Sequence, residues 1–219
     1  MSENKMDENS IPTYLRRYTD LTALINILSL QKITLLDPKT WDDRNDSFFM
    51  SLYKERKNLN TLLALCFSQT GETYHHWRVF SNGPAGVCIV FDKTALLESI
   101  NKINKGTFRT EPIEYLMLKD AKSRKLTTND LPFIKRIGFK PEKEFRIIYE
   151  STSDELPTLD IPISLSSIRS ISLSPWMHHS LSKSIAASIR AIKDCSKIKV
   201  SRSTLISNEQ WKALGENAI

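Results

Sequence analysis

The chain has 219 residues, 40% of them hydrophobic, which suffices for one buried core and is short for two domains of ordinary size. No stretch approaches the roughly 18 uninterrupted apolar residues of a membrane-spanning helix, and three cysteines are too few for a disulfide framework. These features exclude transmembrane and disulfide-rich secreted proteins. We expect a cytoplasmic protein without a membrane partner, with a flexible N-terminus over residues 1–12 and a single domain over residues 13–219.

The formal net charge of +6 is unevenly distributed. Residues 102–146 hold twelve Lys and Arg against six Asp and Glu, an excess equal to the whole net charge. Such a segment can attract phosphate-bearing partners, nucleic acid or a dinucleotide, but it can equally be a solvated face without a specific partner.

Strands and helices alternate in the first half of the chain. Apolar runs predict strands over residues 14–18, 32–36, 61–67 and 86–91. Thr19 and Asp20 are candidate caps of a helix that begins at Leu21, and Asp92 is the candidate cap of a second helix that runs through Ile100. A further helix is expected around residues 75–80, where the breaker residues 81–84 end it.

Strands dominate the second half. We expect them over residues 108–118, 142–148, 161–163, 170–174 and 198–200, with one amphipathic helix over 181–192. Residues 119–140 are polar and basic, which predicts loop mixed with short helix. Because strands outnumber helices and the connections are irregular, the fold class is α+β, with a mixed or largely antiparallel sheet and flanking helices.

The strand predicted over residues 142–148 carries unusual charges. Side chains alternate across a strand, so Glu142, Glu144 and Arg146 should share one face while Phe145 and Ile147 share the other. The apolar face can pack into a core. Charges on a buried strand are costly unless they pair with each other or line a water-filled cleft. This strand is therefore the candidate functional site, and ion pairing with Arg146 is its purely structural explanation.

Several kinds of site are excluded by their missing motifs. The four histidines form two adjacent pairs, and neighbours on a helix point about 100° apart, so no metal site is predicted. Neither a phosphate-binding loop nor a nucleophilic Ser or Cys motif is present. Two residues that are two positions apart on a strand lie roughly 6.5–7 Å apart at the backbone. This distance overlaps the separation of the two catalytic carboxyl groups in inverting glycosidases. A glycosidase or nucleoside hydrolase using Glu142 and Glu144 therefore stays open.

Three short motifs, taken in chain order, resemble a known signature. They are the basic strand segment 16–18, Ser68 within residues 67–70 at a strand end, and residues 142–144. Their order is similar to the arginine, Ser-x-Ser/Thr and Glu-x-Glu signature of one clade of ADP-ribosyltransferases. The resemblance implies an ADP-ribosyltransferase-like fold with NAD as the cofactor and no metal.

The same resemblance implies a role for each residue. Arg16 or Arg17 would hold the NAD pyrophosphate, and Ser68 would orient the nicotinamide ribose. Glu144 would stabilise the cation that develops as nicotinamide leaves, while Glu142 would assist the acceptor. Two aromatic residues are candidates for stacking on nicotinamide or adenine, although such residues often belong to the core: Tyr18 and Trp77.

A longer pattern is similar to a prokaryotic family known as domain of unknown function 2971. The matching segments span most of the chain and are residues 14–18, 24–28, 41–46, 66–68 with Trp77, 86–92 and 142–148. Phe145 replaces the family's Trp, Pro141 stands where an aromatic residue is usual, and the box at 41–46 lacks the usual Asn and Pro. The family implies no activity of its own.

Together these features predict an NAD-dependent ADP-ribosyltransferase-like domain that modifies a nucleic acid or protein acceptor, as a toxin or phage-defence effector. The alternative is a non-enzymatic nucleic-acid or protein-binding domain dominated by the basic residues 102–140. The sequence carries no signal for oligomeric state.

Overall fold

The computed structural model describes residues 13–81, 83–216 and 218. The flexible N-terminus expected over residues 1–12 lies outside the described residues. Strands within these ranges are β1 (Tyr14–Asp20), β2 (Lys32–Leu36), β3 (Thr61–Ser68), β4 (Gly86–Asp92), β5 (Thr107–Pro112), β6 (Glu114–Leu116), β7 (Ile134–Arg136), β8 (Glu144–Ser151), β9 (Thr158–Pro162), β10 (Ile168–Leu173) and β11 (Lys199–Arg202).

Helices are α1 (Leu21–Leu30), α2 (Arg44–Arg56), α3 (Tyr74–Phe80), α4 (Lys93–Asn101), α5 (Leu118–Ser123), α6 (His179–Ala191) and α7 (Glu209–Glu216). Short 3-10 segments are η1 (Pro38–Thr40), η2 (Gly83–Ala85), η3 (Thr128–Phe133), η4 (Ile137–Glu142) and η5 (Leu165–Ser167). Asp20 caps α1 and Asp92 caps α4, as predicted. None of the described helices is both long and apolar enough to span a bilayer.

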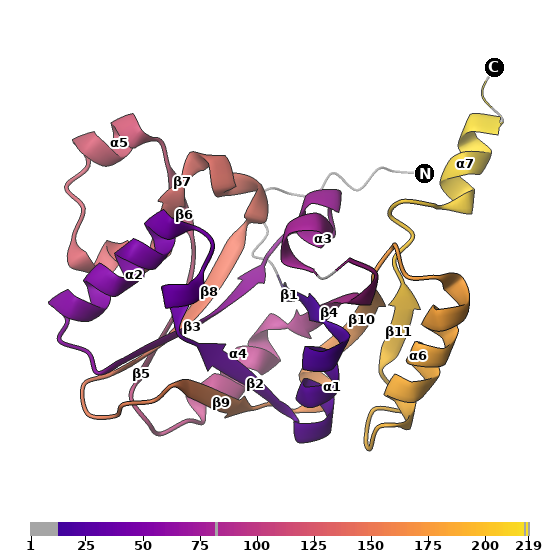
Figure 1. Cartoon of the computed structure of the whole chain (residues 1–219), viewed down its shortest axis with the longest axis horizontal. Helices are drawn as coiled ribbons and strands as arrows, with labels where there is room; N and C mark the ends of the chain where they lie inside the picture. The colour runs from indigo at the N-terminus through magenta and orange to yellow at the C-terminus, as the bar shows by residue number, and fades with distance from the viewer. Residues whose placement is uncertain (1–12, 82, 217, 219) are drawn as a thin grey trace.

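The main sheet is mostly antiparallel and is divided near its middle (Figure 1). Its strand order is β11-β10-β4-β1-β3-β2-β9, while β8 pairs with β3 and β5. Strand β1 pairs with β4 along its whole length but with β3 at one position only, where Arg16 lies opposite Ser68. Only β10–β11 and the separate pair β6–β7 are parallel among the described strands. The predicted α+β class is confirmed.

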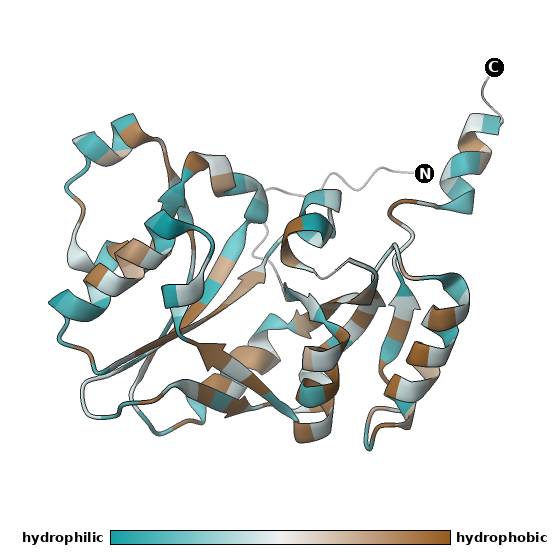
Figure 2. Cartoon of the chain, viewed as in Figure 1, coloured by the Kyte–Doolittle hydropathy of each residue, from teal (hydrophilic) through white to brown (hydrophobic). Residues whose placement is uncertain are grey.

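Helices cover the two faces of the sheet differently. The large core lies on one face, under α1, α4 and α6, and includes Phe145, Ile147 and Tyr149 from β8. On the opposite face α2 packs over β3 and β8, whereas α3 packs over β1 and β4. Figure 2 shows the hydrophobic residues concentrated on the strands and on parts of the covering helices. The division of the sheet therefore lies between α2 and α3.

The charged strand differs from its prediction at one end. It begins at Glu144 rather than Glu142, because Pro141 belongs to η4 and Lys143 adopts a left-handed backbone conformation (φ 42°, ψ 53°) that turns the chain. The strand predicted over residues 108–118 is likewise interrupted after Pro112, which separates β5 from β6. Glu142 thus reaches the site from a turn.

Candidate active site

A cavity of about 350 Å³ lies where the sheet divides. It opens between α2 and α3, on the face of β1, β3 and β8 opposite the large core. Its lining includes six of the seven residues predicted from the sequence: Arg16, Arg17, Tyr18, Ser68, Glu142 and Glu144. Segments far apart in the sequence therefore meet at one cavity.

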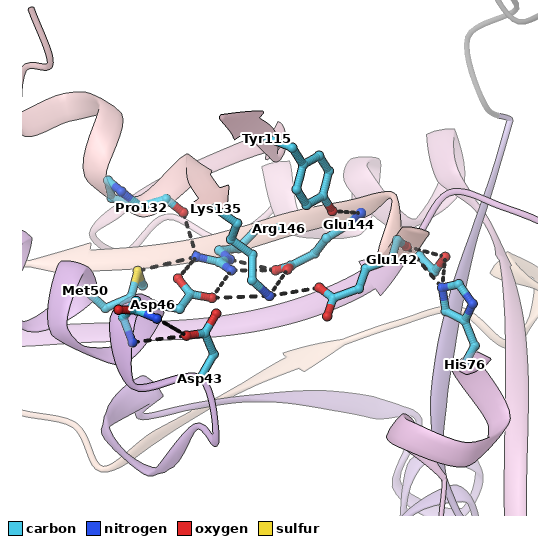
Figure 3. Close-up of polar contacts among 12 residues, drawn as sticks. Asp43, Asp46, Met50, His76, Tyr115, Pro132, Lys135, Glu142, Glu144 and Arg146 are labelled. Carbon is cyan, nitrogen blue, oxygen red and sulfur yellow. Dashed lines mark hydrogen bonds and ion pairs between the residues drawn. The ribbon is translucent and has the colours of Figure 1, made fainter. Parts of the chain in front are cut away.

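Arg146 is fully buried at the base of this site and holds two carboxylates (Figure 3). Its NH1 and NH2 groups donate to the two oxygens of Asp46 at 2.9 and 2.7 Å. Its Nε donates to Glu144 Oε1 at 2.8 Å, and NH1 also donates to the carbonyl oxygen of Pro132 at 2.7 Å. The bidentate geometry is the strong form of an ion pair, so Arg146 fixes the directions of both acids.

Lys135 joins the three acids of the site from the other side. Its Nζ lies 2.8 Å from Glu142 Oε2, 3.0 Å from Glu144 Oε2 and 3.5 Å from Asp46 Oδ2. Glu142 Oε1 is the one carboxylate oxygen of this cluster without a hydrogen bond or ion pair to any described residue. Three acids against two cations leave an excess of negative charge, and one oxygen remains available.

The two glutamates have pKa values shifted in opposite directions. Burial raises the pKa of Glu142, although Lys135 works against this shift. Burial alone would also raise the pKa of Glu144, but the charges of Arg146 and Lys135 outweigh it, and that pKa lies below its usual value. Paired carboxyl groups whose environments separate their pKa values are suited to different roles. Glu144 is a fixed anion, whereas Glu142 can exchange a proton.

Ser68 and His76 anchor the turn that carries Glu142. Ser68 Oγ donates to the Glu142 carbonyl oxygen at 2.8 Å and accepts from Thr70 N at 3.3 Å. His76 Nδ1 lies 2.5 Å from the Thr73 hydroxyl, and Nε2 lies 3.0 Å from Ser68 Oγ and 3.1 Å from the Glu142 carbonyl. With the Thr73 hydroxyl donating to Nδ1, Nε2 carries the proton. All the hydrogen-bonding positions of Ser68 are then taken within the protein.

The two predicted aromatic residues lie in different places. Tyr18 lines the cavity and stacks on His76 with ring centroids 5.4 Å apart, and its hydroxyl is buried beside Cys88. Trp77 is fully buried outside the lining, meets the Tyr18 ring edge-on at 5.2 Å and donates to Glu72 at 3.0 Å. Trp77 therefore supports Tyr18 and does not itself reach the cavity.

Two charged residues of the site were not singled out from the sequence. Asp46 is buried at the first turn of α2, a helix that the sequence reasoning did not predict, and Lys135 lies on the three-residue strand β7. Asp43 supplied a usable signal for α2, because its carboxylate caps the helix by accepting from the backbone of Asn45 and Asp46. For Lys135 no local signal exists.

The cavity also contains aromatic side chains that the sequence reasoning did not assign to it. Trp41 lies 4.6 Å from the Arg146 guanidinium, and Phe139 lies 4.9 Å from Lys135 Nζ. Phe80 is 39% exposed at the cavity wall.

Cys66 lines the cavity too, but burial and the nearby Glu144 raise the pKa of its thiol well above the usual value, so it is not a thiolate nucleophile. Among the described residues, no three or more His, Cys, Asp or Glu side chains are arranged so that they could hold a metal ion.

Replacing His76 by glutamine is expected to lower the free energy of unfolding by roughly 1–3 kcal/mol at neutral pH, because the buried Ser68 hydroxyl and Glu142 carbonyl lose the Nε2 donor. Burial, with His75 and Arg16 nearby, lowers the pKa of His76 below 6.5. As the pH falls, His76 is therefore protonated in the unfolded chain at a higher pH than in the folded chain. The free energy of unfolding of the wild type thus decreases as the pH drops below about 6.5. Urea unfolding at pH 7.5 and 5.5 should show a smaller pH effect in His76→Gln. The exposed His179→Gln is the matched control, and an equal pH effect in wild type and His76→Gln would contradict the assignment.

Comparisons with known proteins complete the description of the site. The family described as "Protein of unknown function (DUF2971)" matches residues 76–147, from α3 to the middle of β8. No curated protein matches the sequence. Solved structures of DarT from Thermus sp. 2.9 match at low similarity. The complex with NAD+ has 10% identity and a TM-score of 0.44, covering 89% of this chain and 96% of that one. The complex with ADP-ribosylated ssDNA has 11% identity and a TM-score of 0.45, covering 88% and 94%. The family resemblance expected from the motifs is thus confirmed by the match of DUF2971 to residues 76–147.

Proposed function

We propose that this chain is an NAD-dependent ADP-ribosyltransferase-like enzyme that modifies a macromolecular acceptor, nucleic acid or protein. The observation that carries the proposal is the convergence of Arg16, Ser68, Glu142 and Glu144 on one cavity. We place the activity in the cytoplasm, as that of a toxin or phage-defence effector.

The chemistry of the cavity suits NAD. Arg16 NH1 donates to the carbonyl oxygen of Thr70 at 2.8 Å, which leaves other guanidinium donors for a pyrophosphate. Trp41 and Phe80 offer ring faces in the same lining for nicotinamide or adenine. A dinucleotide would therefore find partners for its phosphates and for its rings in the same cavity.

When bound, NAD+ supplies an ADP-ribosyl group whose ribose C1′ becomes cationic as neutral nicotinamide leaves with the electron pair of the glycosidic bond. Glu144 holds a fixed negative charge for this cation, within a cluster whose net charge is negative. Glu142 takes the proton from the acceptor oxygen or nitrogen as that atom bonds to C1′, because its Oε1 is free and its pKa is raised. The proton ends on Glu142 and the positive charge of the substrate is lost.

We assign Ser68 a positioning role within this proposal. A direct hydrogen bond from Ser68 to the ribose would require it to release the Glu142 carbonyl, Thr70 or His76. Its existing bonds instead hold the turn that places the Glu142 side chain. The predicted contact of Ser68 with the ribose stays a prediction.

NAD is expected to raise the melting temperature of the purified chain. At a concentration 100-fold above Kd, a ligand stabilises the folded state by about 2.7 kcal/mol, which corresponds to about 5–10 °C for a chain of this size. Arg16→Gln should reduce the shift, whereas Arg169→Gln, an exposed arginine on β10 outside the cavity, should not. Incubation with labelled NAD and nucleic acid or lysate then separates transfer from hydrolysis. A melting temperature that NAD leaves unchanged would favour the non-enzymatic alternative.

A further inference from the structure

A second cavity, of about 420 Å³, lies on the other side of the charged cluster. It is formed by the first turns of α2 together with β6, β7 and α5, which lie together at one end of the molecule (Figure 1). Asp43, Asp46 and Lys135 line this cavity and the first one alike. The two cavities are therefore neighbours that share a wall, and the Lys135 ammonium in that wall contacts Glu142 and Glu144.

The lining of the second cavity combines exposed apolar surface with unpaired positive charge. Phe48 is 60% exposed and Leu118 is 62% exposed, which is unusual for such large hydrophobic side chains. Arg44 and Arg136 are exposed at the same cavity, and neither guanidinium has an ion pair or hydrogen bond to any described residue. Phe48 contacts the neighbouring Phe49 ring at 6.2 Å between ring centroids, while both guanidinium groups remain available to an anionic ligand.

The basic segment of the sequence extends this surface. Lys119 and Lys122 are exposed on α5, and Lys125 follows in the adjoining loop, each without an ion pair among the described residues. Arg124, by contrast, is engaged with Glu114 and Asp130. Much of the local charge excess therefore stands beside the second cavity, where it is available to an anionic ligand.

We propose that this second cavity binds the acceptor, and that the acceptor is a single-stranded nucleic acid. This inference rests on the proposed function. Arg44 and Arg136 would contact backbone phosphates, and the exposed ring of Phe48 would stack on an unpaired base. A duplex hides the faces of its bases, and an acidic peptide would use the arginines but leave the Phe48 ring without a planar partner. The Phe48 ring and the two arginines together therefore suit a single-stranded nucleic acid.

The shared wall places this strand next to the reaction. A nucleotide held against Asp46 and Lys135 in the second cavity lies beside the ammonium that holds Glu142 Oε2 at 2.8 Å. Glu142 Oε1, which has no partner among the described residues, is on the same side chain. NAD and acceptor would thus approach the same carboxylate from neighbouring cavities.

The test measures binding of the full chain to fluorescent 20-nucleotide single-stranded DNA and RNA by anisotropy, without NAD and at several salt concentrations. Arg44→Glu/Arg136→Glu should weaken binding at least 10-fold. It should also reduce the slope of log K against log salt concentration by about 1.4, since each phosphate contact with a single strand contributes roughly 0.7 to that slope. Phe48→Ala should weaken binding about 10-fold, and Phe48→Trp should restore it. Arg56→Glu, the same charge change at the exposed far end of α2, is the matched control and should have little effect.

The NAD-induced rise in melting temperature is measured on the same variants, so that the two proposals can fail separately. If NAD stabilises every variant and the strand still binds all of them as wild type does, the acceptor site is overturned while the transferase proposal stands. If NAD stabilises none of them and only the cavity variants lose the strand, the site is supported and the transferase proposal fails. A wild-type chain that binds neither oligonucleotide, or binds a poly-glutamate peptide more tightly, also overturns the acceptor site.

Discussion

Changing Asp46 to asparagine is expected to lower the free energy of unfolding by about 3–5 kcal/mol, because the buried Arg146 guanidinium loses the anion of its bidentate contact and keeps only Glu144 as a charged partner. Arg146 is fully buried, and Asp46 supplies both oxygens of its bidentate contact. Lys135 loses a neighbour in the same change. Urea unfolding of wild type and variant, followed by circular dichroism, measures the difference.

Asp160→Asn is the matched control, since it breaks the exposed pair with Lys32 and should cost less than about 1 kcal/mol. A loss below 1 kcal/mol in Asp46→Asn would show that the cluster does not depend on this pair.

Local signals in the sequence were sufficient for the elements that frame the cavity. Asp20 and Asp92 cap the helices that follow β1 and β4, and each capping hydrogen bond joins two residues that are close in the sequence. The alternation predicted for the charged strand also holds, since Glu144 and Arg146 face the site while Phe145 packs into the large core. These features follow from short-range chemistry and strand geometry.

Long-range contacts explain what the sequence did not reveal. Helix α2 buries only Asp46, Met50 and Tyr53, so it lacks the continuous apolar stripe by which a helix is found. Asp46 pairs with an arginine 100 positions away, a contact that no local pattern encodes. The departure of Glu142 from the strand depends on the left-handed backbone of Lys143. The ion pair of Glu144 with Arg146 on the same strand could therefore be predicted, whereas the pairs that join distant segments, Arg146 with Asp46 and Lys135 with the acids, could not.

Glu142→Gln is expected to lower the rate of ADP-ribosyl transfer about 100- to 10,000-fold, the range that a general base contributes. An amide cannot take the acceptor proton, but it keeps the shape of the side chain, so the NAD-induced rise in melting temperature should persist. Glu144→Gln is the comparison. It should lower both transfer and stability, because Arg146 and Lys135 lose the anion that they share.

The pH dependence of kcat/KM distinguishes a base from a merely structural acid. Burial raises the pKa of Glu142 above the usual value of 4.5, so transfer by the wild type should fall as the pH drops through this raised pKa and the carboxylate becomes protonated. The low pKa of Glu144 keeps that group ionised over the same range. The fall should therefore be absent from the residual activity of Glu142→Gln. If the variant retains wild-type rates, or if the acidic fall persists in it unchanged, the acceptor proton goes to another group and Glu142 is not the base.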